Sequence, residues 1–483
     1  MKSLKIIFAF ITLMAMASAG LTSCIEDAIS TSAADQPVFS TDTVRMGELF
    51  TLDASPTQRF IVYNRHSKGL NISRIAFADD PDGVFRINVD GMSGREFNNV
   101  EIRAKDSIFV FVETTLPENG LDKPADILAH IEFLTNGVTS KMPVKATGRD
   151  AVRLKGDVRF AGDDVLEGKK PIHVYDSLVV EQGGRLTIKE GVELYFHENA
   201  RVVVHGTLNI SGTAENPVNM TGHRTGFVAA SIPYEIMSGQ WEGIEFTPTS
   251  RGNVIAYASI RNSTSGLVLN GVTAENGSPG LTLVNSQVRN TKGYVIDAFA
   301  SDLTVAGCEL ADASEGIVRL VAGNHIFNHC TIANYYLFTA LGGPAVQLGH
   351  LNEDFALEPD EENGAETEPI PYLTADFSNC IIYGNGTDLS HGDLDGTEVY
   401  LRRCLLKSKG EDDEHFINCL WDEDPLYYTE RENYIFDYRL RPESPAIGTA
   451  QPELTLPLTT TDFYGTPRTT PSIGAYEVTP EKQ

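Results

Sequence analysis

Adjacent carboxylates are the first residues of this sequence that could do chemistry, because glycoside hydrolysis needs two acids that flank one sugar linkage. Two pairs are candidates, Asp163-Asp164 and Asp412-Asp413. The first lies at the start of a region of short repeated strands, where a ligand groove is least expected, and the second lies in a charge run typical of a solvated turn. His223 with Arg224 offers groups that a lyase could use, yet a polar turn explains them more simply. We therefore assign no catalytic residue.

A second candidate site is an acidic stretch, Leu351 to Ile370, that interrupts the short strands. Its carboxylates could gather Ca²⁺, which takes several oxygen ligands with modest geometric precision. No spaced Asp-x-Asp-x-Asp-Gly loop is present, so a solvated loop is the simpler interpretation, and either form could wall a polymer groove. The acids proposed as ligand contacts are Glu358, Asp360, Glu361 and Glu362. A further acidic turn with the same two interpretations contains Asp388, His391, Asp393 and Asp395.

Aromatic side chains could stack on the sugar rings of a glycan. We name Trp241, Tyr335, Tyr336 and Trp421 as candidates. The alternative is burial, which is the commoner fate of aromatic rings in a narrow coil.

Cysteines form a regular column rather than a set of disulfides. Apart from Cys24 there are five, an odd number, so they cannot all pair within one molecule. Side chains stacked in parallel on neighbouring strands do not turn their Cβ atoms together as a disulfide requires. We expect free thiols, with a soft-metal site at Cys308 and Cys330 as the alternative. The four expected in the stack are Cys308, Cys330, Cys380 and Cys404.

The elements that position these groups are short strands that recur once per coil. The four cysteines extend a column of small residues that begins with Ala258 and Ser286, and successive members are 28, 22, 22, 50 and 24 residues apart. An apolar residue precedes each by three positions, and Leu186 with Ile188 recurs as Leu208 with Ile210. Such a period indicates a solenoid, with one coil and an insertion inside the longest gap. Right-handed parallel crossovers are strongly preferred, so we predict a right-handed parallel β-helix.

A second column follows each small residue by four positions. Its members are Asn262, Asn290, Asp312 and Asn334. Side-chain amides at one turn of successive coils can bond each other and the turn backbone, so we interpret this column as a structural ladder.

Composition and charge exclude one class of partner. The 483 residues include 38 Lys and Arg against 66 Asp and Glu, for a net charge of −28. Contact with the phosphates of nucleic acid is therefore not expected.

The first 23 residues have the form of a targeting segment, with Lys2 and Lys5 ahead of an apolar run and a small-residue exit. The exit Leu21-Thr22-Ser23-Cys24 resembles the bacterial lipobox, which implies that Cys24 is acylated and holds the protein in the outer membrane. Glu26-Asp27 is similar to the export signal of surface lipoproteins in Bacteroidetes, which implies exposure at the cell surface, with retention on the periplasmic side as the alternative.

The remaining sequence predicts an all-β chain of two domains. Short alternating strands between about 37 and 150 predict an antiparallel sandwich, and pieces such as Asn88-Val89-Asp90-Gly91 resemble the immunoglobulin-like domain of Bacteroidetes lipoproteins. The segment Gly239 to Phe246 resembles one found in bacterial β-helix proteins with the pectate-lyase-like fold. Asp462 to Arg468 and Ile473 to Glu477 are similar to a choice-of-anchor closing segment. The predicted parts are a signal peptide at 1–23, a tether at 24–36, an immunoglobulin-like sandwich at 37–150, a β-helix at 151–445 with its insertion at about 351–371, and a cap at 446–483.

We expect the cap to seal the open end of the solenoid, with Arg468 paired to Asp462 or Glu477. The resemblance implies fold rather than activity, since this scaffold carries lyases, hydrolases, adhesins and spacers alike. Gly349-His350 and Ser390-His391-Gly392 do not reproduce the Gly-His-Gly of polygalacturonase-like hydrolases. We expect a non-catalytic surface module that binds a glycan or a cell-surface protein and needs no cofactor. The alternative is a polysaccharide lyase or glycoside hydrolase.

Overall fold

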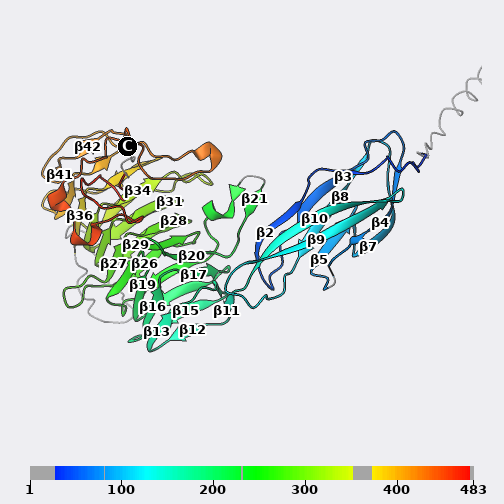
Figure 1. Ribbon diagram of the computed structural model, residues 1–483. Helices are drawn as coiled ribbons and strands as arrows, with labels where there is room; N and C mark the ends of the chain where they lie inside the picture. The colour runs from blue at the N-terminus through cyan, green and yellow to red at the C-terminus, as the bar shows by residue number, and fades with distance from the viewer. Residues whose placement is uncertain (1–27, 81, 230–231, 352–371, 479–483) are drawn as a thin grey trace, which may run out of the picture. The chain divides into compact units, whose positions relative to one another are not determined.

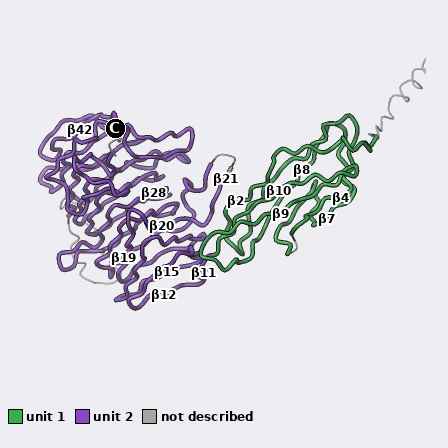
Figure 2. Tube along the Cα trace, viewed as in Figure 1, with its two compact units in different colours: residues 1–150 green, residues 151–483 purple. Residues whose placement is uncertain are grey.

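Alternation of buried and exposed residues builds the strands of the first unit. In β8 (Ser107–Thr114) the even-numbered residues are buried and the odd-numbered ones face outward. Asn136-Gly137 joins two longer strands, and both residues have the positive φ that a tight hairpin turn requires. The computed structural model describes residues 28–80, 82–229, 232–351 and 372–478, in two compact units, 1–150 and 151–483 (Figures 1 and 2).

Two five-stranded sheets form the first unit and share one apolar core. The front sheet has the order β1-β3-β8-β5-β6, and the back sheet has the order β2-β10-β9-β4-β7, with β2 parallel to β10. The strands are β1 (Val38–Phe39), β2 (Val44–Phe50), β3 (Gln58–Tyr63), β4 (Leu70–Phe77), β5 (Phe85–Val89), β6 (Met92–Gly94), β7 (Glu96–Ile102), β9 (Ala125–Thr135) and β10 (Val138–Arg149). This unit is a two-sheet β-sandwich.

Three parallel sheets run the length of the second unit, and each coil contributes one strand to each sheet. Sheet I contains β11 (Val152–Leu154), β14 (Ile172–Val174), β17 (Glu193–Phe196), β20 (Val218–Gly222), β25 (Ala258–Arg261), β28 (Gln287–Thr291), β31 (Glu309–Ala313), β34 (Thr331–Asn334), β37 (Ile381–Gly384), β40 (Leu405–Leu406) and β42 (Leu420–Trp421). Sheet II contains β12 (Val158–Phe160), β15 (Ser177–Val180), β18 (Arg201–Val204), β23 (Gly243–Phe246), β26 (Leu267–Asn270), β29 (Tyr294–Phe299), β32 (Gly316–Val321), β35 (Val346–Gly349) and β38 (Leu389–Ser390).

Sheet III contains β13 (Asp163–Leu166), β16 (Arg185–Lys189), β19 (Thr207–Ser211), β24 (Asn253–Ala256), β27 (Leu281–Val284), β30 (Leu303–Ala306), β33 (Gly323–Asn328), β36 (Leu373–Ser378), β39 (Val399–Arg402) and β41 (Phe416–Ile417). Among the described residues, a small hairpin and four short 3₁₀ turns lie outside the sheets of the second unit: β21 (Phe227–Ala229), β22 (Ile232–Pro233), η1 (Tyr234–Ile236), η2 (Arg431–Asn433), η3 (Pro452–Leu454) and η4 (Pro457–Thr459). The prediction of an all-β chain with a parallel solenoid is confirmed. No helix in the described part of the chain is long and apolar enough to cross a membrane.

Identical positions of successive coils stack to make the core of the solenoid. The apolar residues that precede the small-residue column are in register along sheet III, and Phe327 stacks on Phe377 with ring centroids 4.7 Å apart. The ladder reads Ile188, Ile210, Ile255, Leu283, Val305, Phe327, Phe377, Leu401 and Phe416. Each coil therefore depends on its neighbours to bury its inward face.

The asparagine column satisfies turn backbone. Asn262, Asn290 and Asp312 have φ of 71°, 58° and 58°, the left-handed region that Asn and Asp tolerate better than most residues. The Asn262 and Asn290 amides donate to the carbonyl of Glu235 at 2.8 and 2.7 Å, and Asn334 donates to the carbonyl of Ala313 at 2.9 Å. These bonds run to backbone carbonyls of the turns.

The C-terminal segment packs along the side of the solenoid, on the outer face of sheet I. Ala311, Ala333 and Leu405 of that face share an apolar cluster with Tyr438 and Ile473. Polar contacts tie the same segment to coils from Tyr257, which bonds Thr461 at 3.0 Å, to Arg403, which donates to the Thr449 carbonyl at 2.6 Å. The segment that we expect to seal the open end thus lies over the outer face of sheet I, in contact with several coils.

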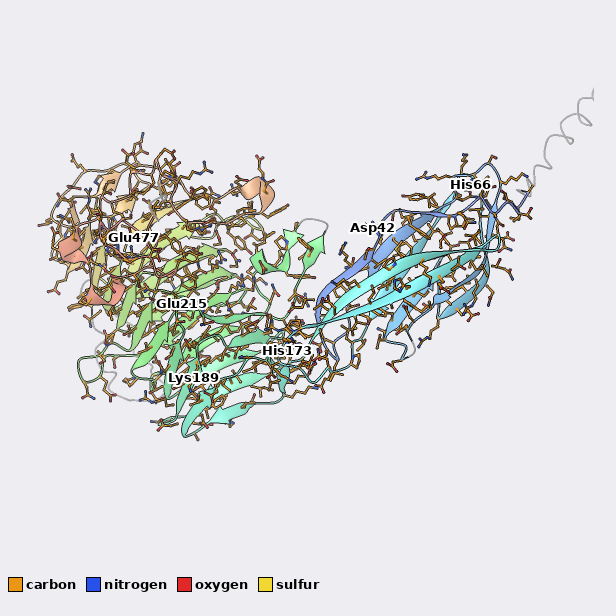
Figure 3. All side chains as sticks on the ribbon, viewed as in Figure 1. Asp42, His66, His173, Lys189, Glu215 and Glu477 are labelled. Atoms are coloured by element: carbon orange, nitrogen blue, oxygen red, sulfur yellow. The ribbon has the colours of Figure 1, made fainter. Side chains whose placement is uncertain are left out.

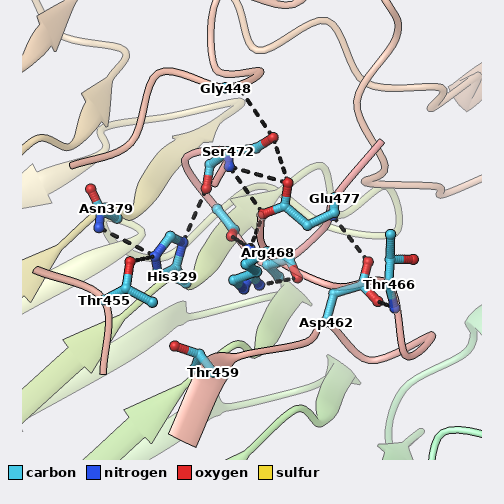
Figure 4. A network of polar contacts seen from close by, with 12 residues as sticks. His329, Asn379, Gly448, Thr455, Thr459, Asp462, Thr466, Arg468, Ser472 and Glu477 are labelled. Atoms are coloured by element: carbon cyan, nitrogen blue, oxygen red, sulfur yellow. Dashed lines mark hydrogen bonds and ion pairs between the residues drawn. The ribbon is translucent and has the colours of Figure 1, made fainter. Parts of the chain in front are cut away.

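A buried ion pair holds this segment together, as Figure 4 shows. Arg468 donates to Glu477 at 2.5 Å, and the two side chains are 1% and 6% exposed. Glu477 also accepts from the backbone and hydroxyl of Ser472, while Asp462 accepts from the backbone N–H of Glu477. Of the two expected partners, Glu477 therefore forms the ion pair with Arg468. The carboxylate of Asp462 accepts the backbone N–H of Glu477 beside this pair.

We predict that Arg468→Met lowers the free energy of unfolding by about 3–5 kcal/mol, because it leaves the Glu477 carboxylate buried without its cation. Arg439→Gln is the control, since its pair with Asp437 is more than half exposed on the arginine side and is worth about 0–1 kcal/mol. Urea unfolding followed by circular dichroism measures both. Equal losses in the two variants would contradict the assignment.

Candidate functional site

Trp241 lies inside the solenoid and offers no ring face to a sugar. It is 1% exposed and stacks on Phe196 with centroids 4.1 Å apart. Its indole N–H donates to the carbonyl of Arg261 at 2.8 Å, so its polar atom is also satisfied. The proposed contact between Trp241 and a ligand is corrected.

Tyr335 and Tyr336 also serve packing. Tyr336 is 8% exposed and shares a hydrogen bond of 2.7 Å with Ser238. Tyr335 is half-buried against Tyr427 and Tyr438 of the C-terminal segment, and burial raises the pKa of its hydroxyl. Trp421 is half-buried, packs 5.1 Å from Phe416, and donates to Asp412 at 3.1 Å. Of the four candidate aromatics, Tyr335 and Trp421 are therefore half-buried, and Trp241 and Tyr336 are buried.

The second of the two carboxylate pairs caps a turn. Asp412 accepts backbone N–H groups of Asn418 and Cys419, and Asp413 accepts those of His415 and Phe416. These bonds to backbone N–H lower the pKa of Asp413, as expected for a carboxylate held in its charged form. Asp163 is exposed and lies 3.6 Å from Arg185.

His223 and Arg224 belong to separate contacts. The His223 ring stacks on His197 with centroids 3.9 Å apart, and Arg224 lies 3.8 Å from Glu198. These contacts do not bring the two residues together as a base and a cation around one substrate atom.

The four stacked cysteines are free and buried, as the column predicts, and Cys419 is free and half-buried. Burial raises the pKa of Cys308 and Cys380 well above that of an ordinary thiol, and their Sγ atoms donate to backbone carbonyls. His325 and His329 point elsewhere, to the carbonyls of Ala322 and Ser472. Within residues 28–80, 82–229, 232–351 and 372–478, no three His, Cys, Asp or Glu side chains are grouped as metal ligands.

The acidic candidates Glu358, Asp360, Glu361 and Glu362 lie outside the described residues, and so does the targeting segment with Cys24. The stretch leaves sheet II after β35 and enters sheet III at β36. Tyr372, which directly precedes β36, is 47% exposed.

A groove on the outer face of sheet III is the strongest candidate site. Its floor is built by outward residues of β30, β33, β36 and β39, and the loop 274–279 contributes to its lining. Its volume is about 480 Å³, within the range of ligand sites. Its lining includes Asp302, Asn324, Ile326, Thr374, Asp376, Glu398, Tyr400 and Arg402.

Hydrogen bonds between coils fix the polar side chains of the groove. Asp302 accepts from the Asn324 amide at 2.7 Å and from the Ala274 backbone at 2.6 Å, and Thr374 donates to Asn324 at 2.9 Å. In the next row, Arg402 donates to Asp376 at 2.6 Å. These bonds hold side chains of adjacent coils in one plane at the strand spacing.

The groove also contains apolar and aromatic surface. Ile326 is 42% exposed between two polar coils. Tyr400 stacks on His415 with centroids 6.0 Å apart, and the Arg402 guanidinium lies 4.8 Å from its ring centre. Polar rows beside a ring and an apolar floor suit a ligand with both hydroxyls and C–H faces.

A second hollow of about 410 Å³ extends this surface toward the last coils. Its lining includes His391, Asp393, Asp395 and Glu414, and His415 of its wall stacks on Tyr400 of the groove. The outer face of sheet III carries ion pairs between strands in the earlier coils, where Arg185 and Lys189 of β16 pair with Asp163 and Glu167. Lys189 is labelled in Figure 3. The acidic turn at 391–395 predicted from sequence therefore lies beside the groove.

Comparisons with known proteins do not name a family. No family model matches the chain, and no curated protein matches it. Two solved structures resemble part of it: a family 123 glycoside hydrolase from Clostridium perfringens, at 9% identity and TM-score 0.18, and a protein of unknown function from Porphyromonas gingivalis W83, at 12% and 0.17. The matches cover 26% and 27% of this chain, and 26% and 59% of those chains. Such partial likeness supports no functional argument.

His325 lies beneath the groove as a buried, titratable residue. The side chain is 2% exposed, and its Nδ1 has no hydrogen-bond partner among the described residues. Burial lowers its pKa to about 4 from 6.5. The folded protein therefore holds this ring neutral under conditions in which an unfolded chain would begin to protonate it.

We predict that this residue destabilises the protein as the pH falls from 6.5 toward about 4, because the unfolded state binds the proton first. The contribution of the neutral His325 ring to stability is fully present above pH 6.5 and is lost between pH 6.5 and about 4. His325→Leu should reduce the difference in the free energy of unfolding between pH 7.5 and 4.5 by about 2–3 kcal/mol, since over about two pH units of that range the unfolded ring is protonated and the folded ring is not. Urea titrations at the two pH values measure it, and an unchanged difference would contradict the prediction.

Proposed function

We propose that this protein is a non-catalytic module that binds an extended, uncharged polysaccharide along the groove on sheet III. The observation that supports this proposal is the row of polar side chains from adjacent coils that hydrogen bonds hold in place next to Ile326 and Tyr400. A linear polymer can lie across such coils and meet the same kind of contact at each strand spacing.

The contacts of the groove carboxylates favour binding over catalysis. Both oxygens of Asp376 are engaged, by Arg402 and by the Ser378 hydroxyl at 2.7 Å. Both oxygens of Asp302 accept bonds as well, from Asn324 and Ala274. A general acid or base must be free to exchange a proton with its substrate, which these two acids are not.

The charge of the groove favours an uncharged ligand. The charged groups described in its lining are the carboxylates of Asp302, Asp376 and Glu398 and one cation, Arg402. The neighbouring hollow adds four carboxylates and two histidines. Like charges on a uronate polymer would be repelled by this surface.

Binding is tested with the chain from Ile25 to Gln483 and soluble neutral polysaccharides, such as a β-glucan and a mannan, by affinity electrophoresis. We predict that Tyr400→Ala weakens retention by about tenfold, the loss of one stacked ring. Tyr428→Ala is the matched control, because that tyrosine is 44% exposed away from the groove lining. New reducing or unsaturated sugar ends would overturn the proposal in favour of a hydrolase or lyase, and equal retention by both variants would remove the groove from it.

We further propose that acylated Cys24 anchors the module in the outer membrane and exposes it at the cell surface, where it meets a glycan or a cell-surface protein. The support is the sequence alone: Lys2 and Lys5, the apolar run, and Leu21-Thr22-Ser23-Cys24. Several acyl chains would make such attachment essentially permanent, at about 0.8 kcal/mol per buried methylene.

Cys24→Ser should release the protein from the membrane fraction of the producing bacterium and abolish incorporation of labelled fatty acid. Cys419→Ser serves as control, since that thiol lies in the solenoid. Protease added to intact cells should digest the anchored protein if it faces outward. A membrane-bound Cys24→Ser protein would refute the anchor, and complete protection from protease would refute surface exposure.

A further inference from the structure

The two outer faces of the sandwich differ in chemistry. On the back sheet, exposed charges pair with one another: Arg74 with Glu96 at 3.0 Å, and Lys141 with Glu132 at 2.9 Å. This is the ordinary solvent face of an antiparallel sheet, apolar inward and polar outward. It sets the expectation for the front sheet, which has the same number of strands and shares the same core.

The front sheet breaks this alternation on β3 and β8. Ile61, Tyr63, Phe109 and Phe111 occupy outward positions, and Phe109 is 42% exposed. The rings of Phe109 and Phe111 stack with centroids 6.2 Å apart and an angle of 29°. Phe111 beside Phe109 is half-buried, and adjoining rings that keep exposed area on an outer face are a feature of binding surfaces.

Guanidinium groups accompany these rings. Arg65 lies 3.9 Å from the centre of the Tyr63 ring, and Arg59 lies 5.8 Å from that of Phe109. Such contacts hold the cations over aromatic surface while leaving N–H donors available. In a chain of net charge −28, a face that gathers arginines and rings stands apart from its surroundings.

Register places complementary groups in one row across the strands. Phe111 of β8 is paired with Arg59 of β3 on one side and with Asn88 of β5 on the other, and Asn88 is paired with Ser93 of β6. Asn88 donates to the Ser93 hydroxyl at 3.0 Å. Guanidinium, ring, amide and hydroxyl therefore lie side by side on one face.

The end of this row opens into a hollow of about 820 Å³. Arg86 and Arg95 are in its lining, and the carboxylate described there, Glu113, accepts from the Thr57 hydroxyl at 2.6 Å. A concave site of this size suits a short run of sugar rings, whereas a protein partner needs about 800 Å² of matched surface on each side.

We propose that the front sheet of the first unit binds an acidic polysaccharide, with sugar faces on Phe109 and Phe111 and carboxylates on the arginines. Arginine binds carboxylates through paired N–H groups, and the amide and hydroxyl of the row serve the neutral hydroxyls of the sugar. This site is separate from the groove of the solenoid and has the opposite charge preference. The first unit is therefore a second recognition element rather than a spacer.

The test uses the chain from Ile25 to Gln483 and polygalacturonate fragments, with binding measured by calorimetry at low salt. Phe109→Ala and Arg59→Gln should each weaken binding by about tenfold. Leu128→Ala and Lys145→Gln are the controls, an exposed apolar residue and an exposed cation on the back sheet. Tyr400→Ala should leave this binding unchanged, which separates the site from the groove.

Four outcomes would overturn the proposal. They are absence of polygalacturonate binding, equal losses in the back-sheet controls, equally tight binding of a neutral galactan that Phe109→Ala abolishes, and self-association in sedimentation that Phe109→Ala abolishes. The last would make the face an interface between copies. Matching thermal midpoints of all variants establish that a loss of binding is not a loss of fold.

Discussion

Hydrogen bonding between coils in strict register is the constraint on which the second unit depends. Each inward residue must fit against the residue one coil before and one coil after it, as Phe327 fits against Phe377. Narrow corners accept small side chains, which is why Cys308 and Cys330 stand where earlier coils have Ala258 and Ser286. The thiols are free and buried because of where they stack, and they pack as small apolar groups.

The same register sets what the outer faces can do. An outward position recurs once per coil, so a surface of any length is a column of side chains, each from a different coil. On sheet I the outward residues Ala311, Ala333, Ile381 and Leu405 pack against the C-terminal segment. On sheet III the column is polar in the coils that form the groove, and it is held rigid by bonds such as Arg402 to Asp376. One repeating backbone thus offers one side to its own chain and another to a ligand.

Periodicity explains what the sequence could predict. The inward ladder and the small-residue column are visible because their members recur at coil length, and the structure has them in register from Ile188 to Phe416. The groove is not visible in this way, because Asn324 and Tyr400 belong to coils separated by the insertion and share no motif. The prediction that Trp241 contacts a ligand is wrong because it rests on the residue type, which suits sugar stacking, while the position of Trp241 puts it in the core. The cover of sheet I by the C-terminal segment is equally hidden from the sequence: all five residues of β31 are buried, although Glu309 and Asp312 among them have types that favour solvent.

The C-terminal segment has a consequence for how the protein comes apart. A bare solenoid is an array of neighbours, and its coils can open one after another from an end. Here Thr461 bonds Tyr257 across 204 residues, and the same segment reaches Asn328, Asn379 and Arg403. None of these coils can open until the C-terminal segment, which contacts all of them, has detached. The coils between Tyr257 and Arg403 are thereby joined into one cooperative block, in which no single coil opens to a protease without its neighbours.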